Sequence, residues 1–328
     1  EEVIVTARQV EEPIFDTPYT VDAITDQRIR MANFRATPDL FREMPGTLVQ
    51  KTAHGQGSPY IRGFTAFRNL FMVDGVRLNN AVFREGPNQY WATVDVGSMR
   101  RMEVVRGPKS VLYGSDAIGG TVNVISRGPQ AYKEDETFNG GLHYRYGHGE
   151  DSNIFGGFAD AAIGDDGGFL IGASTKDFGD LESGNGELPY TGYEEWTLDS
   201  KLVYELNDNL TLTAAHSQVH QDDVPRTHKT IHAVPFSGSS VGSEIRRDLF
   251  QDRMLSYVRI DAGEAMGLDN WRVTLFNHNQ EEKRERERSG DRYDEQGFEV
   301  NTWGFNLVTN LETSGLGIFT FGADWAHD

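Results

Sequence analysis

From about residue 138 onward, the chain repeats segments in which apolar and polar side chains alternate, and this pattern constrains the fold more than any other feature of the sequence. An alternation with a period of two indicates a β-strand with one apolar face, and about ten residues is the length of a tilted strand that crosses a bilayer. In one such segment, Leu202, Tyr204 and Leu206 form the apolar face. We predict strands near residues 138–147, 153–163, 168–176, 196–206, 210–220, 253–261, 271–283, 299–311 and 318–327.

The connections between these predicted strands alternate in length. Short turns are predicted at 164–167, 207–209, 262–270 and 312–317, whereas long polar stretches occupy 177–195, 221–252 and 284–298, with the short connection at 148–152 as an exception. This asymmetry is expected when the two ends of a barrel face different compartments. Alternation alone would fit a soluble sandwich equally well, so the unequal connections favour antiparallel transmembrane β-barrel strands.

Composition excludes several other classes of protein. Apolar runs such as Leu70 to Val73 are far shorter than the roughly 18 residues that a membrane-spanning helix needs. The formal charge of −19 argues against nucleic-acid binding, which needs Lys and Arg to neutralise phosphates. Residues 1–130 carry 15 Lys+Arg against 14 Asp+Glu, so the acidic surplus lies in residues 131–328. With 0 cysteines, a disulfide framework, a thiolate zinc site and a cysteine nucleophile are excluded.

The region before residue 130 predicts a smaller mixed α+β unit. A strand is predicted from Tyr19 to Ile24, a helix from Asp26 to Ala32, and a second helix that begins with Thr37 as N-cap and Pro38 at its first position. Further strands are predicted at Thr47–Lys51, Tyr60–Phe64, Leu70–Val73, Met99–Arg106 and Thr121–Ser126, with long loops at His54–Pro59 and Asn79–Thr93. Loops of that length in a compact domain are usually functional or disordered.

The first residues alternate and are β-branched from Val3 to Thr6. This segment is too short to form a core of its own. It fits either an edge strand or an exposed peptide that adds a strand to the sheet of a partner protein.

Four short strings occur in order within the mixed region, and together they resemble the plug domain of TonB-dependent outer-membrane transporters. The resemblance covers residues 1–130 by motif and the remainder by pattern only. The strings are Tyr60-Ile61-Arg62-Gly63-Phe64, Met72-Val73-Asp74-Gly75-Val76, Met102-Glu103-Val104-Val105-Arg106-Gly107-Pro108 and Leu112-Tyr113-Gly114-Ser115-Asp116-Ala117-Ile118-Gly119-Gly120-Thr121-Val122-Asn123-Val124-Ile125.

The resemblance implies a division of the chain into three parts: a TonB box and linker at 1–12, a plug domain at 13–130, and the N-terminal part of a transmembrane β-barrel at 131–328. Barrels of this family have about 22 strands around a plugged lumen, so the nine predicted here are expected to be the front part of a longer protein. The segment that looks like the TonB box consists of Glu2, Val3, Ile4, Val5, Thr6 and Ala7.

The resemblance also implies roles for single residues. In similar transporters the arginines of two plug motifs, here Arg62 and Arg106, pair with barrel glutamates; as isolated residues, both would fit ordinary surface arginines. Ligands meet the outward tips of the plug, and aromatic and cationic side chains suit a planar, often anionic chelate. An alternative is that Tyr90 and Trp91 pack inside the plug. The implied ligand-binding candidates are His54, Phe67, Arg68, Asn79, Arg84, Tyr90 and Trp91.

Four histidines near the 221–252 stretch, together with His54, suggest a haem or metal complex. A solvated acidic loop with incidental histidines explains them more simply, and no resident metal or cofactor is predicted. These weak candidates are His216, His220, His228 and His232.

The sequence therefore predicts TonB-dependent import of a scarce nutrient across the bacterial outer membrane, with a ferric siderophore or haem as first choice. TonB with its inner-membrane energising complex, outer-membrane lipid and a small iron chelate are the expected partners, and the long loops are expected to be extracellular. Vitamin B12 or a saccharide is an alternative cargo. Rival classes are a secreted β-sheet protein that binds carbohydrate or a host surface, and a periplasm-facing enzyme, although the chain contains no His-Glu-x-x-His metalloprotease motif.

Overall fold

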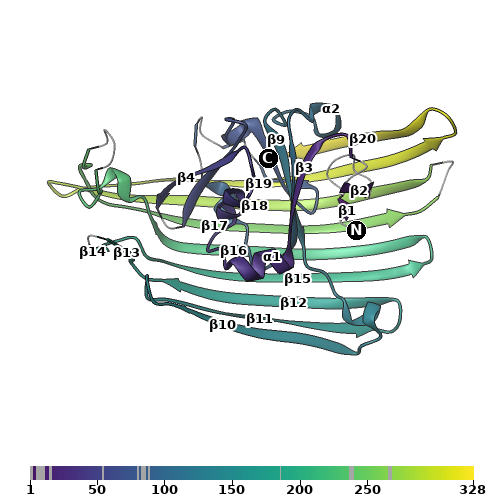
Figure 1. Cartoon of the computed structure of the whole chain (residues 1–328), viewed down its shortest axis with the longest axis horizontal. Coiled ribbons are helices and arrows are strands. Elements are labelled where there is room, and N and C mark those ends of the chain that lie inside the picture. Colours follow the sequence, from purple (N-terminus) through teal and green to yellow (C-terminus); the bar gives the residue numbers. More distant parts are fainter. Residues whose placement is uncertain are drawn as a thin grey trace.

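A computed structural model describes residues 3–4, 12–14, 17–53, 55–79, 81–82, 86–87, 89–184, 186–235, 240–264 and 268–328. Its largest element is a sheet of nine strands in which every strand pairs antiparallel with its neighbours (Figure 1). In the described part of the chain, the edge strands of this sheet are its first and last. The strands are β10 (Phe138–Gly147), β11 (Ser152–Ile163), β12 (Gly167–Phe178), β15 (Tyr193–Asn207), β16 (Leu210–Pro225), β17 (Glu244–Ala262), β18 (Asn270–Arg288), β19 (Arg292–Thr313) and β20 (Gly317–His327).

All nine predicted strands are present. Four of them extend well past the predicted bounds at the end that carries the long connections, so the predicted long loop at 284–298 is wrong. Instead, β18 and β19 continue to a turn between Arg288 and Arg292. Likewise β16 runs to Pro225 and β17 begins at Glu244, which shortens the predicted 221–252 loop. The 177–195 stretch contains a small hairpin of β13 (Leu181–Ser183) and β14 (Gly186–Leu188).

The two faces of the nine-stranded sheet differ in burial, as the alternation predicts. Along β17, Leu255 and Tyr257 are buried on the inner face, whereas Val258 points outward and is 47% exposed. Large apolar side chains on the outer face are exposed on most strands, which is the pattern of a surface that lipid covers. They include Phe138, Leu142, Phe155, Ile171, Trp196, Leu275, Trp303, Phe305, Phe321 and Trp325.

A second sheet of five strands, in the order β3-β8-β9-β6-β7, forms the plug domain, which lies against the inner face of the large sheet (Figure 1). Among the described strands of this sheet, β6 and β9 pair in parallel and the other neighbours pair antiparallel. The strands are β3 (Thr20–Thr25), β6 (Asn69–Val73), β7 (Val76–Arg77), β8 (Met99–Arg106) and β9 (Gly120–Ser126), with a separate hairpin of β4 (Thr47–Ala53) and β5 (Gln56–Ile61). The helices are α1 (Asp26–Ala32) and α2 (Ser110–Tyr113), and short 3-10 segments occur at Thr37–Glu43, Ala66–Arg68, Tyr90–Thr93, Ala131–Glu134 and Thr227–Lys229.

Two predictions for the plug need correction. Thr37 does not cap the second helix: Ala36 is the N-cap, and the Thr37 hydroxyl donates instead to the Val94 carbonyl. This segment is a 3-10 helix with Pro38 in its first turn. The predicted loop from His54 to Pro59 is largely strand β5, because a small hairpin pairs it with β4. His54 itself lies outside the described residues.

The glycine pair Gly119-Gly120 shows why this plug motif is rich in glycine. A Cβ on Gly119 would lie 2.3 Å from Asn69 Oδ1 and 3.0 Å from the Ile61 carbonyl oxygen. A Cβ on Gly120 would lie 2.9 Å from the Val105 carbonyl oxygen. Close approach of neighbouring atoms, rather than a turn conformation, therefore favours glycine at both positions.

The main hydrophobic core lies inside the plug and continues to the barrel wall, where Leu255, Tyr257 and Phe276 pack against plug residues. No helix among the described residues is long and apolar enough to cross a membrane. At the N-terminus, Val3 and Ile4 form β1 (Val3–Ile4), which pairs antiparallel with β2 (Glu12–Pro13). The other residues of the predicted TonB box lie outside the described residues.

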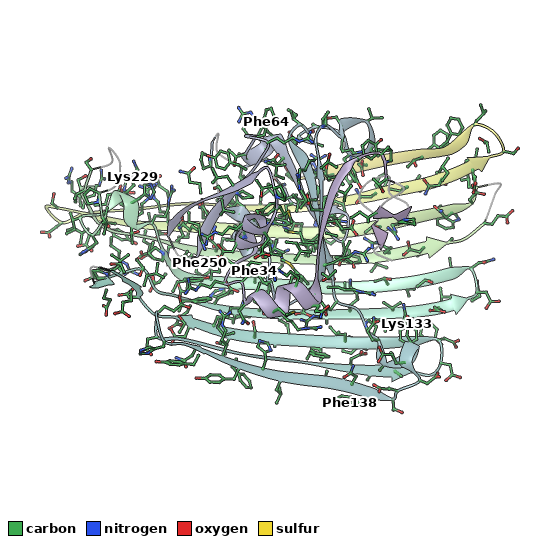
Figure 2. All side chains as sticks on the ribbon, in the orientation of Figure 1. Phe34, Phe64, Lys133, Phe138, Lys229 and Phe250 are labelled. Atoms are coloured by element: carbon green, nitrogen blue, oxygen red, sulfur yellow. The ribbon has the colours of Figure 1, made fainter. Side chains whose placement is uncertain are left out.

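One end of the large sheet is called the short-turn end here. It carries the connections β11–β12, β15–β16, β17–β18 and β19–β20, and it lies at the right in Figure 1. Lys133, in the segment that joins the plug to β10, lies at this end, and Lys229 lies at the opposite end (Figure 2).

Candidate functional site

The contact between the plug and the barrel wall is centred on Asp74, in the turn between β6 and β7. Asp74 and Gly75 both have positive φ, 50° and 79°, as a two-residue hairpin turn requires. The Asp74 amide donates to the Val124 carbonyl at 2.7 Å, and the Gly75 amide donates to Asn123 Oδ1 at 3.0 Å. Neighbouring strand β9 thus fixes the turn, and the Asp74 side chain points to the wall.

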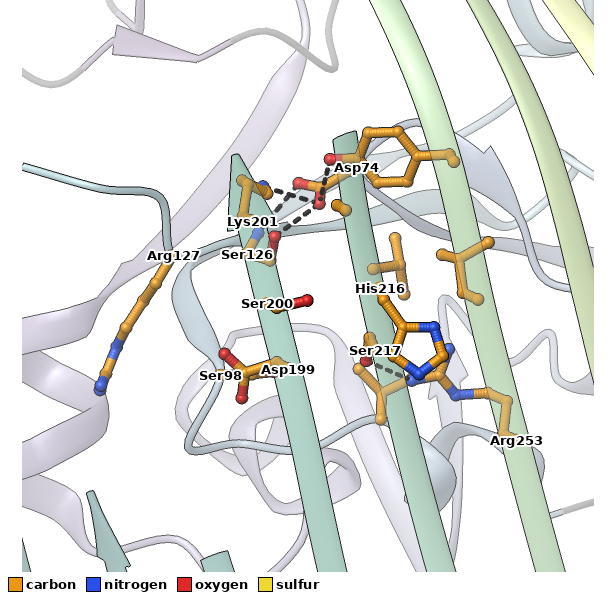
Figure 3. Close-up of a pocket in the computed structure, with 15 residues that line it drawn as sticks. Asp74, Ser98, Ser126, Arg127, Asp199, Ser200, Lys201, His216, Ser217 and Arg253 are labelled. Carbon is orange, nitrogen blue, oxygen red and sulfur yellow. Dashed lines mark hydrogen bonds and ion pairs between the residues drawn. The ribbon is translucent and has the colours of Figure 1, made fainter. Parts of the chain in front are cut away.

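Side chains from two barrel strands converge on the Asp74 carboxylate (Figure 3). Lys201 Nζ of β15 lies 3.0 Å from Asp74 Oδ2, and the Tyr257 hydroxyl of β17 donates to the same oxygen at 2.9 Å. Within the plug, Ser126 donates through its hydroxyl at 2.5 Å and through its amide at 3.0 Å. Arg259 of β17 donates to the Asp74 backbone carbonyl.

The Asp74 carboxylate is buried, yet it is held in its charged form. Burial by itself would raise its pKa, because low-dielectric surroundings disfavour charge. The positive charges of Lys201 and Arg259 and the two hydrogen bonds from Ser126 outweigh this effect and hold the pKa of Asp74 well below its usual range. The contact is therefore an ion pair at neutral pH.

A second contact lies between the plug loop after Tyr90 and strands β12, β15, β16 and β17. Lys176 Nζ lies 2.6 Å from Asp95 Oδ1 of the plug and 2.5 Å from Glu195 Oε1 of β15. Gln221 Nε2 donates to the other Glu195 oxygen at 2.7 Å, and Arg253 Nε donates to the Thr93 carbonyl at 2.8 Å. Burial would raise the pKa of Asp95, but Lys176 and the backbone amides of the plug lower it below its usual value.

Further polar contacts spread over the sheet. Arg35 Nε donates to Glu150 Oε1 at 2.9 Å, near the long-connection end of β11. Gln89 Nε2 donates to Glu282 of β18 at 2.9 Å. A cavity of about 20 Å³ next to Asp74, drawn in Figure 3, holds roughly one water molecule. The plug therefore fits closely against this part of the wall, through polar contacts beside the apolar core.

Two of the predicted ligand-binding residues are buried, and for Trp91 the structure agrees with the alternative that it packs inside the plug. Trp91 is 1% exposed and packs in the plug core, with its ring centroid 4.8 Å from that of Phe71. Tyr90 is 4% exposed and meets Phe298 of β19 edge to face, at 5.8 Å between centroids. The Tyr90 ring therefore lies between the plug and the wall rather than inside the plug.

The other ligand-binding candidates do not form one cluster in the described residues. Asn79 is buried and donates to Thr302 Oγ1 of β19 at 2.6 Å, so it contributes to the contact with the wall. Phe67 and Arg68 are half-buried, and the Arg68 guanidinium lies 4.8 Å from the centre of the Phe67 ring. His54 and Arg84 lie outside the described residues. Ligand binding by any of the seven candidates stays a prediction.

The two plug arginines occupy different environments. Arg106 forms an ion pair with Asp22 of β3, inside the plug. Arg62 is exposed, has a φ of 51°, and its guanidinium approaches Gly107. Their pairing with barrel glutamates stays a prediction.

The four histidines are dispersed. His216 and His220 share the outer face of β16, where His216 Nδ1 lies 2.8 Å from Ser256 Oγ and His220 Nδ1 lies 3.1 Å from Asp252 Oδ2. His220 also stacks on Trp196, and His232 lies against Tyr190. His228 belongs to the short 3-10 segment Thr227–Lys229. Within the described residues, no group of three His, Cys, Asp or Glu side chains could hold a metal ion.

Sequence reasoning missed Asp74, Asp95, Lys176 and Lys201. The sequence did contain a signal for Lys176 and Lys201. Both occupy inward positions of regular barrel strands, and a buried lysine needs an anionic partner. The partner could not be chosen from sequence, because Lys201 and Asp74 are 127 positions apart.

Comparisons with known proteins agree with this architecture. A family model described as the TonB-dependent Receptor Plug Domain matches residues 13–121. The vitamin B12 transporter BtuB of Vibrio vulnificus is 30% identical over 285 residues, which cover 82% of this chain and 44% of that protein. The BtuB protein of Photobacterium profundum is 31% identical over 136 residues, covering 41% of this chain and 21% of that protein.

Solved structures share the fold at low identity. The FrpB iron transporter from Neisseria meningitidis matches with a TM-score of 0.78 at 13% identity, covering 93% of this chain and 48% of that chain. The ferripyoverdine receptor of the outer membrane of Pseudomonas aeruginosa matches with a TM-score of 0.74 at 17% identity, covering 99% of this chain and 44% of that chain.

A plug domain seated on antiparallel barrel strands defines a plugged β-barrel receptor. The chain belongs to the family of TonB-dependent receptors. It spans less than half the length of the Vibrio vulnificus relative, 44%.

Proposed function

We propose that this protein takes part in TonB-dependent active import of a scarce nutrient across the bacterial outer membrane, and that its first-choice cargo is a ferric siderophore or haem. The observation that carries the proposal is the seating of the plug on the barrel wall by buried ion pairs at Asp74 and Asp95. A plug held this way closes the lumen at rest.

These contacts suit a plug that must be displaced and then return. Buried ion pairs add little net stability compared with apolar packing, because desolvation offsets their attraction, but they penalise wrong arrangements. A force applied to the N-terminal segment would separate Asp74 and Asp95 from their lysines, and both carboxylates would find the same partners on return. The short-turn end would then face the periplasm and the long connections the exterior.

Energy coupling is assigned to the segment from Glu2 to Ala7, which would add as a strand to TonB. Val3 and Ile4 pair with Glu12 and Pro13, so this segment would exchange an internal partner strand for TonB. TonB draws on its inner-membrane energising complex, and the receptor itself performs no chemistry on the cargo.

Vitamin B12 is the second candidate cargo, because the Vibrio vulnificus and Photobacterium profundum relatives are described as vitamin B12 transporters. The chain matches structures of an iron transporter and a ferripyoverdine receptor at 13% and 17% identity, which supports the fold and leaves the choice of cargo to experiment. Isolation of the receptor from its native membrane, followed by mass spectrometry of the bound small molecule, distinguishes a ferric chelate from cobalamin.

Replacing Val5 by Pro tests the coupling mechanism. Proline removes the amide that a strand addition needs, so Val5→Pro should abolish uptake of radiolabelled cargo while cargo binding to whole cells is retained. Val5→Ala, which keeps the amide, is the matched control and should transport. Normal uptake by Val5→Pro, or uptake in cells that lack TonB, would remove the proposed function.

A further inference from the structure

A second, larger cavity lies between the plug and the barrel wall, on the short-turn side of Asp74. Its volume is about 450 Å³. Four neighbouring strands, β15 to β18, supply its wall through Val203, Thr213, Arg259 and Arg272. It shares Asp74, Ser126, Lys201 and Tyr257 with the small cavity of Figure 3. The Asp74 contact therefore separates two parts of one gap along the wall.

The charge of this larger cavity is opposite to that of the chain. Its lining holds six basic side chains and one acidic side chain, Asp74, in a chain with a net charge of −19. Two basic groups have carboxylate partners outside the lining: Arg101 pairs with Glu103, and Arg272 pairs with Asp261. The other three basic groups besides Lys201 are Arg100, Lys133 and Arg259. Among the described residues, none of these three forms an ion pair with a carboxylate side chain. The six basic residues are Arg100, Arg101, Lys133, Lys201, Arg259 and Arg272.

We propose that this cavity is an anion-binding compartment on the route between plug and wall, and that the cargo carries carboxylate, phosphate or phenolate oxygens. The inference rests on the proposed import function and narrows it to an anionic cargo. A cleft lined by charges of one sign concentrates counter-ions, and guanidinium groups bind planar oxyanions through paired hydrogen bonds.

The Asp74 carboxylate occupies, in the resting protein, the position that an anion would take between Lys201 and Tyr257. Displacement of the plug turn removes this carboxylate and leaves Lys201 and Arg259 facing the gap. The compartment thereby gains one positive charge when the route opens. Cargo and Asp74 thus compete for the same groups, and the return of Asp74 expels the anion.

Residues 1–328 contain no cysteine, so an introduced cysteine can report on this cavity. A cysteine introduced at Ile125, a half-buried residue of the cavity lining, is exposed to a negatively charged sulfonate methanethiosulfonate or a positively charged trimethylammonium methanethiosulfonate. The receptor without this cysteine gives the background reaction. The reactions are followed on the full-length receptor in detergent micelles at low ionic strength. Ser314→Cys, exposed in the turn before β20 at the same end of the sheet, is the matched control.

We expect the ratio of anionic to cationic reaction rates at Ile125→Cys to exceed that at Ser314→Cys by about tenfold, the lower end of the concentration effect of a charged cleft. Adding Arg100→Gln and Lys133→Gln should bring this ratio close to the control value, whereas Arg30→Gln and Arg42→Gln, in plug residues outside the cavity, should leave it high. High salt should reduce it.

Three outcomes would overturn the proposal: equal ratios at the two cysteines, a high ratio that the double neutralisation leaves unchanged, or an Ile125→Cys variant that reacts with neither reagent. Because the labelling needs neither TonB nor an identified cargo, its failure is distinguishable from failure of the import function. If TonB-dependent uptake is normal but the ratio of anionic to cationic reaction rates is equal at the two cysteines, the anion-binding compartment is ruled out and the import function is not.

Discussion

Lys201 Nζ of barrel strand β15 lies 3.0 Å from Asp74 Oδ2 of the plug, and both side chains are largely buried, at 11% and 5% exposure. One barrel cation thus meets one plug anion where both side chains are largely removed from solvent. Because a charge left alone in such a place is costly, this pair sets where the plug turn rests against the wall.

Replacing Lys201 by Met should lower the free energy of unfolding by about 2 kcal/mol, because Asp74 keeps only its hydroxyl, amide and arginine neighbours. Urea titration of the full-length receptor in detergent measures the change. Lys283→Met, in an exposed ion pair with Glu285, is the control and should change stability clearly less than Lys201→Met, because solvent screens exposed pairs. In a double mutant with Asp74→Asn, the loss should be smaller than the sum of the two single losses; additive losses would contradict a direct pair.

Replacement of Lys176 should destabilise the protein more than replacement of Lys201, because Lys176 neutralises two buried carboxylates. Asp95 and Glu195 are each 4% exposed and lie 2.6 and 2.5 Å from its ammonium group. Lys176→Gln leaves both carboxylates facing each other, so its destabilisation should exceed that of Lys201→Met in the same urea titration. Adding Glu195→Gln should restore part of the loss. A double mutant less stable than Lys176→Gln would show that repulsion between the two acids is not the cause.

The barrel strands could be predicted from sequence because their alternation is local. In β15, Leu202 and Lys201 point to opposite faces, and the period of two is visible without any partner strand. The extension of β18 and β19 could not be predicted in this way. There the charged run pairs across the hairpin, with Arg284 and Arg286 both contacting Asp294, so side chains that look like a solvated loop stabilise two strands.

The site was less predictable than the fold, because its pairs join distant parts of the chain. Asp74 and Asp95 belong to the plug, and Lys201 and Lys176 belong to strands that follow about a hundred residues later. The plug motif signalled the turn at Asp74-Gly75 but not what the carboxylate would meet. The aromatic and cationic residues near Trp91 in the sequence suggested a ligand-binding surface. In the structure, Trp91 belongs to a buried 3-10 helix, and the sequence alone does not distinguish the two cases.

Trp91→Ala distinguishes these two roles of the tryptophan. Removing a side chain that is 1% exposed and packed on Phe71 should cost about 3–5 kcal/mol of unfolding free energy. Phe67→Ala, at a half-buried position, should cost clearly less in the same titration and serves as the comparison. If Trp91→Ala instead kept wild-type stability and lost only binding of the isolated native ligand, the buried role would be wrong.

Acid should loosen the plug only below about pH 4, the usual range of an aspartate pKa. The pKa of Asp74 and the pKa of Asp95 are both held below that range in the folded protein. Their stabilising contribution is therefore fully present above the ordinary carboxyl pKa and is lost as the pH falls toward their lowered values. Between pH 5 and 8 both carboxyls are ionised in the folded and the unfolded protein, so these two groups should not make the free energy of unfolding depend on pH.

Protease protection of the plug, measured between pH 7 and pH 2.5 on the full-length receptor in detergent, reports this loss. In acid, each aspartate with a lowered pKa reduces the free energy of unfolding by up to about 1.4 kcal/mol per pH unit. Asp74→Asn and Asp95→Asn should each start with a weaker plug at pH 7 and show a shallower decline in acid, because one titrating group is gone. A decline as steep as that of the wild-type protein in both variants would mean that other carboxylates hold the plug in place.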